Sequence, residues 1–179
     1  GYAVISIDQR GFGESTGTVR VMDPNFEGQD LLQILDWAEK HLDYLAQDTS
    51  DKVNYNLVAG ATGGSYGGMY QMLIHNMDPK HRLDVLTPDI TPHDLRYSLA
   101  PNSVVKSAWV SLLSAGGEAG ASEKLIGGLD PVIKETLVRG VSTNIIHAGA
   151  LPFFYYHSVA YFTDAMPASE QKPMDFFGA

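Results

Sequence analysis

A serine enclosed by glycines is the residue of this sequence best suited to covalent chemistry. Gly63-Gly64-Ser65-Tyr66-Gly67 fits the pattern G-x-S-x-G, in which a sharp turn between a strand and a helix carries a nucleophilic serine. This turn is called the elbow below. An apolar run precedes it and a helix-like run follows it, which is the context that the pattern requires. Because five-residue patterns occur by chance, a glycine turn that happens to hold a serine is the alternative.

The pattern also predicts roles for the neighbours of Ser65. Side chains two positions before and after the serine would collide with the returning helix, so we expect glycine to be required at Gly63 and Gly67. The strained turn would hold the serine hydroxyl clear of the sheet. The helix that begins here would aim the backbone N–H of Tyr66 at a substrate oxygen, where it could stabilise negative charge during acyl transfer.

A serine hydroxyl also needs a histidine as its base and a carboxylate that orients the histidine. Among the histidines after Ser65, His147 follows a short apolar run that could end a strand, and Asp89 could be its acid. Such an internal triad would require the sheet to end early, so we do not expect it. His157 stands among aromatic residues, and we expect it to pack within a helical cap formed by residues 98–179 rather than to act as a base.

No cofactor and no metal are expected. His93 with Asp89 or Asp94 suggests a metal site at first sight, but no second histidine lies at ligand spacing and H-E-x-x-H is missing. The glycine-rich loop at residues 8–15 has neither G-x-G-x-x-G nor the lysine of a phosphate-binding loop. We therefore expect Asp8 and Arg10 to form an ion pair that fixes this loop.

Strands and helices are expected to alternate in the first half of the chain. The pattern predicts strands at residues 2–7, 53–61 and 83–87, a helix over 24–47, and an elbow helix that ends near residue 77. On the first helix, Glu27, Asp30, Glu39 and Lys40 are expected to face water. Such alternation is typical of a parallel sheet with helices on both faces.

The second half of the chain has a different pattern. Helices are expected at residues 104–113 and 131–138, with a flexible glycine-rich segment at 114–120, and residues 152–162 are strongly aromatic. We expect residues 98–179 to form a helical insertion that covers the site as a cap, with the aromatic run as its lining. Ordinary helical core is the alternative for the aromatic residues.

Composition narrows the class of partner. The 179 residues carry a formal net charge of −9 and no cluster of Lys or Arg, which argues against a nucleic-acid or anionic-membrane partner. No cysteine is present, and no apolar run is long enough to span a bilayer. Composition gives neither the compartment, secreted or cytoplasmic, nor the oligomeric state. Since the sequence opens inside a strand-like run and stops after an aromatic region, we expect a fragment of a longer protein.

Two motifs together resemble a known superfamily. Asp8-Gln9-Arg10-Gly11-Phe12-Gly13-Glu14-Ser15 after a strand-like run, followed by Gly63-Gly64-Ser65-Tyr66-Gly67-Gly68, resembles the α/β-hydrolases. This form of the elbow is similar to that of the X-Pro dipeptidyl-peptidase and cocaine-esterase group of serine hydrolases. The resemblance covers residues 1–97 and implies part of an α/β-hydrolase core, a partial parallel sheet flanked by helices. Residues 98–179 are similar to the helical cap inserted in that group.

The resemblance implies that Ser65 is the nucleophile and that the Tyr66 N–H is one oxyanion donor. In that group the second donor precedes the strand expected at residues 2–7, and the catalytic acid and histidine follow two strands beyond the cap. The expected function is a serine hydrolase that cleaves a small-molecule ester or a peptide, as an acyl esterase or an X-Pro-type dipeptidyl peptidase. The alternative is a non-catalytic binding domain of the α/β-hydrolase fold.

Overall fold

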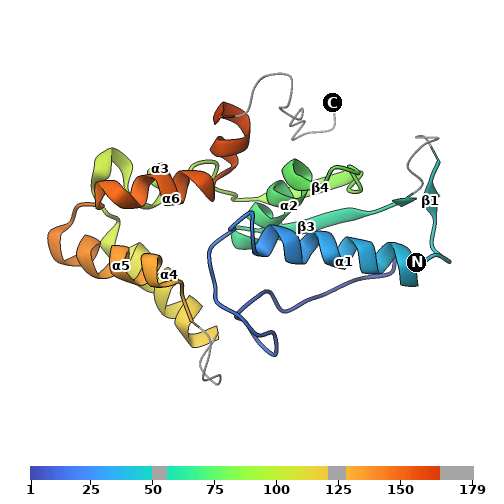
Figure 1. Cartoon of the computed structure of the whole chain (residues 1–179), viewed down its shortest axis with the longest axis horizontal. Helices are drawn as coiled ribbons and strands as arrows, with labels where there is room; N and C mark the ends of the chain where they lie inside the picture. The colour runs from blue at the N-terminus through green and yellow to red at the C-terminus, as the bar shows by residue number, and fades with distance from the viewer. Residues whose placement is uncertain (50–55, 121–127, 166–179) are drawn as a thin grey trace. The chain divides into compact units, whose positions relative to one another are not determined.

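The structure is a computed structural model and describes residues 1–49, 56–120 and 128–165. These residues form two compact units. The first unit comprises residues 1–21 and 96–154, and the second comprises residues 22–95 together with the chain from residue 155 onward. Figure 1 shows the helices and strands of both units.

The second unit carries the elbow. Its elements are α1 (Glu27–His41), β1 (Gln47–Asp48), β2 (Asn56–Leu57), β3 (Gly60–Gly64), α2 (Tyr66–Met77), β4 (Val85–Asp89) and the π-helix η3 (Tyr161–Ala165). The described part of the first unit is mainly helical, with η1 (Pro101–Ser103), α4 (Ser107–Gly120), α5 (Pro131–Thr143) and η2 (Ala148–Ala150). Two short helices, α3 (Leu95–Leu99) and α6 (Leu151–Tyr156), cross the boundaries between the units.

The strand, elbow, helix and strand predicted from the sequence are confirmed. β3 and β4 are parallel and are joined through α2, with Gly60 opposite Val85 and Gly64 opposite Asp89. Parallel neighbours need such a crossover because a tight turn cannot connect them. β4 begins and ends two residues later than predicted. The strand predicted over 53–61 is divided, since β2 pairs antiparallel with β1, and residues 53–55 lie outside the described residues.

One face of the β3–β4 pair is covered by a helix. α2 packs against both strands, and α1 packs against α2 and β2 (Figure 1). Every second residue of β3 and β4 is exposed, and the residues between them are half-buried. Helices on both faces of the sheet, as the sequence predicted, are therefore not found in the described part of the chain.

Two predictions near α1 are corrected. The helix spans Glu27–His41 rather than residues 24–47, and Glu27, which was expected to face water, is 1% exposed. Its carboxylate accepts the backbone N–H of Asp23 at 3.1 Å, so the start of the helix turns this side chain inward. One residue later, a Cβ at Gly28 would overlap the sulfur of Met77, so α1 and α2 approach each other closely at this glycine.

The strand predicted at residues 2–7 is wrong. Residues 1–9 have no regular secondary structure, and Tyr2 and Val4 are exposed. An apolar run forms a strand only where a neighbour accepts its backbone hydrogen bonds, and no described strand pairs with this one. The loop that follows is fixed by Asp8, whose carboxylate accepts the backbone N–H of Glu14 at 3.0 Å.

The helices of the first unit differ from the predicted ones mainly in length. α4 continues through residues 114–120, which were expected to be flexible, and a Cβ at Gly117 would lie 2.8 Å from Leu129. Close packing therefore explains a glycine inside this helix. α5 is longer than predicted, and it is capped by Asp130, whose side chain accepts the N–H of Val132 at 2.8 Å. That this unit caps the site stays a prediction.

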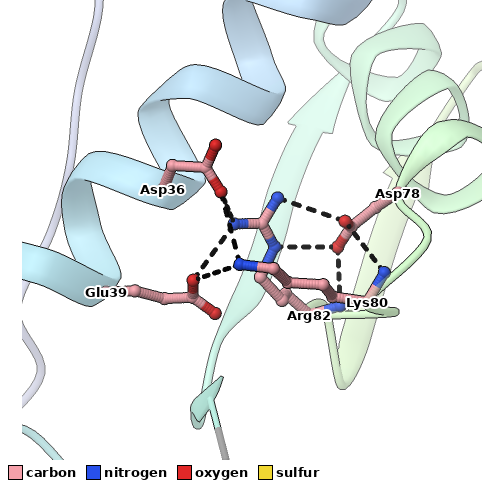
Figure 2. A network of polar contacts seen from close by, with 5 residues as sticks. All are labelled: Asp36, Glu39, Asp78, Lys80 and Arg82. Atoms are coloured by element: carbon pink, nitrogen blue, oxygen red, sulfur yellow. Dashed lines mark hydrogen bonds and ion pairs between the residues drawn. The ribbon is translucent and has the colours of Figure 1, made fainter. Parts of the chain in front are cut away.

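A network of charged side chains joins α1 to the segment after α2 (Figure 2). Arg82 donates from Nε to Asp78 at 3.0 Å and from Nη1 to Asp36 at 2.6 Å. Lys80 donates to Glu39 at 2.9 Å. Asp78 and Arg82 are buried, whereas Asp36 is largely exposed. The network therefore fixes α1 against the end of the helix that begins at the elbow.

Acid will weaken this network and the unit that contains it. Burial acts to raise the pKa of Asp78, but hydrogen bonds from Arg82 and Lys80 outweigh it and hold that pKa below its ordinary value. The unfolded chain then binds a proton at higher pH than the folded chain, so the stabilisation is complete above about pH 4 and is lost as pH falls through the lowered pKa. Urea unfolding at stepwise lower pH measures this. A free energy of unfolding that stays constant throughout this acid range would contradict the prediction.

Candidate functional site

Ser65 lies at the junction of β3 and α2 in a strained conformation. Its φ of 50° and ψ of −113° are rarely adopted by a residue with a side chain, and the residue is exposed. Its N–H donates to the carbonyl of Asp89 at 2.8 Å, and its carbonyl accepts the N–H of Met69 at 2.9 Å. A serine at the start of a helix usually caps it with its hydroxyl, but Ser65 makes no such bond. Its hydroxyl is therefore not used to cap the helix.

The glycines of the elbow have unequal roles. A Cβ at Gly63 would lie 3.2 Å from the backbone of Gly67, closer than an ordinary van der Waals contact, so a side chain at this position would crowd the start of α2. The same reason is wrong for Gly67, where a Cβ would meet no atom within 4 Å outside its own helix.

Gly68 is a required glycine that the sequence analysis did not single out. A Cβ there would overlap the hydroxyl oxygen of Thr91 and lie 3.3 Å from the carbonyl oxygen of Asp89. α2 therefore begins in close contact with the loop after β4. The sequence signal was the second glycine of the Gly67-Gly68 pair, which the G-x-S-x-G pattern does not require.

Gln71 is the other residue that the sequence analysis missed. It lies on α2 and is 2% exposed. Its side-chain nitrogen donates to the carbonyl of Gly63 at 3.0 Å and to that of Gly67 at 3.2 Å, and its side-chain oxygen accepts the N–H of Thr87 at 2.9 Å. An amide within the apolar run Met69–Ile74 was the available signal, since a buried amide must find partners.

Tyr66 is held at the first position of α2. Its ring packs edge-on against that of Tyr70, with centroids 5.3 Å apart. Burial raises the pKa of the Tyr70 hydroxyl, and the neighbouring Tyr66 and Glu27 raise it further, so Tyr70 stays protonated and is no base near neutral pH. That the Tyr66 N–H donates to an oxyanion stays a prediction.

The two candidate partners of Ser65 within this sequence, Asp89 and His147, lie in different units. Asp89 ends β4 beside the elbow and is exposed. His147 lies in the first unit, where its Nδ1 accepts the N–H of Gly149 at 3.1 Å and caps η2. In a triad, Nδ1 would instead face the carboxylate. The triad of Ser65, Asp89 and His147 stays a prediction.

The remaining histidines have local contacts. His157 is 4% exposed, and its Nε2 lies 3.8 Å from Asp23 within the second unit, so it packs with the elbow unit rather than with the helical one. His93 lies 3.5 Å from the hydroxyl of Thr163. Within residues 1–49, 56–120 and 128–165, no three His, Asp or Glu side chains gather as metal ligands would. In the same ranges no helix has the length and apolar character to cross a bilayer.

Comparison with known proteins adds a family to this geometry. The model of the X-Pro dipeptidyl-peptidase (S15 family) matches residues 1–124. Two curated Escherichia coli proteins, both described as an uncharacterized 31.7 kDa protein in the traX-finO intergenic region, are 33% identical over 66 residues, which is 37% of this chain and 21% of each relative. The chain thus spans about a fifth of the length of the curated relatives it matches. No solved structure matches it.

The family match includes both features on which the sequence analysis depended. It contains the Asp8 loop, the elbow and the whole of the strand pair on either side of α2. Since it covers residues 1–124 of 179, the chain belongs to the X-Pro dipeptidyl-peptidase family.

Proposed function

We propose that this chain supplies the nucleophile of a serine hydrolase that cleaves an ester or an amide through an acyl-enzyme on Ser65. Membership of the family supports peptidase or esterase chemistry in general. The observation that carries the specific proposal is the conformation of Ser65, exposed and at positive φ between β3 and α2. Acyl esterase and X-Pro-type dipeptidyl peptidase are both compatible with it, since the two share this chemistry.

The proposed reaction has two halves. The Oγ of Ser65 attacks the substrate carbonyl carbon while a histidine takes the hydroxyl proton, and the carbonyl oxygen becomes an oxyanion that the Tyr66 N–H stabilises. The bond to the leaving group then breaks, and the alcohol or amine departs with the proton from the histidine. Water attacks the acyl-enzyme in the same way, which releases the acid and restores the serine.

A strained serine favours the enzyme over a binding domain. Holding a residue with a side chain in such a conformation costs on the order of 1–3 kcal/mol, and strain of this kind clusters at functional sites. A binding domain of the same fold would gain nothing from this strain. The Ser65 hydroxyl does not cap α2, which supports the same conclusion, because a capping hydrogen bond would occupy the oxygen that must react.

An active-site probe tests the proposal. A fluorophosphonate should label the full-length protein at Ser65, and Ser65→Ala should abolish the labelling, because only an activated serine reacts at a useful rate. Ser142→Ala is the matched control: Ser142 is an exposed serine on α5 whose hydroxyl donates to Arg139, and its loss should leave labelling unchanged. Labelling that persists in Ser65→Ala, or none in the wild type, would reject the mechanism.

A further inference from the structure

The two legs of the elbow share one hydrogen-bond donor. Gly63 lies two residues before Ser65 and Gly67 two residues after it, and the carbonyls of both accept hydrogen bonds from the Gln71 side-chain nitrogen, at 3.0 and 3.2 Å. The NH₂ group of a glutamine has two hydrogens, so one side chain can serve both carbonyls at once. A single buried amide thus joins the residues on both sides of the turn that strains Ser65.

The same side chain also holds the neighbouring strand. Its oxygen accepts the N–H of Thr87 at 2.9 Å. Thr87 lies two residues before Asp89, whose carbonyl accepts the N–H of Ser65 at 2.8 Å. Pro88, between them, lies opposite Gly63 and has no N–H to donate. Gln71 is therefore connected to Ser65 in two ways, through its hydrogen bonds to the turn and through its hydrogen bond to β4.

We infer that Gln71 is a positioning residue that sets the backbone of the elbow and so aims the Ser65 hydroxyl. For its catalytic meaning this inference rests on the proposed function. A buried amide that only stabilised the fold would need partners anywhere nearby, whereas the partners of Gln71 are the two elbow glycines and the strand that binds Ser65. Small errors in the placement of a nucleophile are costly, so loss of this amide should slow the reaction more than it weakens substrate binding.

Gln71→Met removes the hydrogen bonds and keeps the length of the side chain. In the full-length protein we expect fluorophosphonate labelling of Ser65 to slow by roughly 10- to 100-fold, the range for a displaced reacting group. On a short p-nitrophenyl ester, kcat should fall while KM changes little. Exchange of the Ser65 amide hydrogen should become faster relative to that of the amides in α1.

Asn76→Leu is the matched control. Asn76 is a second buried amide on α2, and it donates to the carbonyl of Met72 at 2.7 Å, within the helix and away from the elbow. Its loss should lower the melting temperature, as Gln71→Met does, but leave the labelling rate and the Ser65 amide unchanged. Equal effects of the two variants on labelling and on exchange would overturn the inference, and so would normal labelling of folded Gln71→Met.

A second variant covers the case in which Gln71→Met does not fold. Gln71→Glu keeps the oxygen that faces Thr87 and places an oxygen, in place of the donor, against the two glycine carbonyls, so it should also label slowly. If neither variant melts cooperatively, Gln71 serves folding as a whole and the positioning role is rejected. If the wild type itself is not labelled, the proposed hydrolase fails, and the exchange of the Ser65 amide in Gln71→Met against Asn76→Leu still decides whether Gln71 sets the elbow.

Discussion

Replacing Arg82 by Met will lower the free energy of unfolding by about 3–5 kcal/mol, the usual cost of removing one partner from a buried ion pair. The Arg82 side chain is 4% exposed and that of Asp78 is 1% exposed. Without the guanidinium, the Asp78 carboxylate would keep its burial and lose the charge that compensates it. Asp36 and Glu39 on α1 would lose one of the two cations that they share and keep Lys80 (Figure 2). Chemical unfolding followed by circular dichroism measures the loss.

Two further variants separate this explanation from a general effect of surface charge. Lys80 belongs to the same network but is 48% exposed, so Lys80→Met should cost only about 0–1 kcal/mol. Adding Asp78→Asn to Arg82→Met removes the unpaired charge and keeps an oxygen for the N–H of Lys80, so much of the stability should return. If Lys80→Met costs as much as Arg82→Met, burial is not the cause.

The sequence allowed the elbow and the order of the elements around it to be predicted, because both depend on local signals. Gly63 and Ser65 stand at fixed spacing between an apolar run and a helical run, and the structure places them at the junction of β3 and α2. Asp78 and Pro79 end the helix where the proline forbids its continuation. Signals of this kind act within a few residues, so a single sequence is enough to show them.

The errors come from contacts that composition and residue spacing do not reveal. Residues 2–7 have the composition of a strand, but a strand needs a partner, and composition does not say whether one is adjacent. Glu27 is charged and was expected to face water, yet the N–H of Asp23 lies inside the fold and attracts its carboxylate. Gly117 was expected to lie in a flexible segment, since its contact with the side chain of Leu129 cannot be foreseen from the sequence.

Only the residues of the G-x-S-x-G pattern were predicted for the candidate site. G-x-S-x-G identifies the serine and two glycines, and the sequence analysis explained both glycines by the same collision with the helix. The structure separates them, because the strand leg is crowded at Gly63 and the helix leg is open at Gly67. Gln71 could not be assigned a role from the sequence, since its partners become its neighbours only when α2 folds back over β3 and β4.

Substitutions at the adjacent glycines Gly67 and Gly68 of α2 should change the free energy of unfolding in opposite directions. Gly68→Ala will lower the free energy of unfolding by about 1–3 kcal/mol, as overpacking of a filled site does. Gly67→Ala will leave the free energy of unfolding unchanged or raise it by up to about 1 kcal/mol, because alanine has a higher helix propensity than glycine. The two substitutions are chemically identical and one residue apart, so the opposite signs would follow only from the space that each Cβ meets. Unfolding of both variants under the same conditions makes the comparison.

Thr91 provides the means to show that the collision is the cause. The added Cβ of Gly68→Ala would overlap the Thr91 hydroxyl oxygen, so Thr91→Ala should restore part of the lost stability. On its own Thr91→Ala removes only the bond from this hydroxyl to the Asp89 carbonyl, at 3.3 Å, and should cost little. A double variant as unstable as the sum of the single variants would show that the hydroxyl is not what Gly68 avoids.

The same collision should be visible at the nucleophile. The carbonyl of Asp89 lies 3.3 Å from the position of the added Cβ and also accepts the N–H of Ser65, so a loop pushed away by Gly68→Ala takes with it one support of the strained serine. Labelling of Ser65 should therefore slow in Gly68→Ala, recover with Thr91→Ala and stay normal in Gly67→Ala. If labelling slows equally in both glycine variants, the first turn of α2 acts on Ser65 through the helix, and the loop after β4 is not its support.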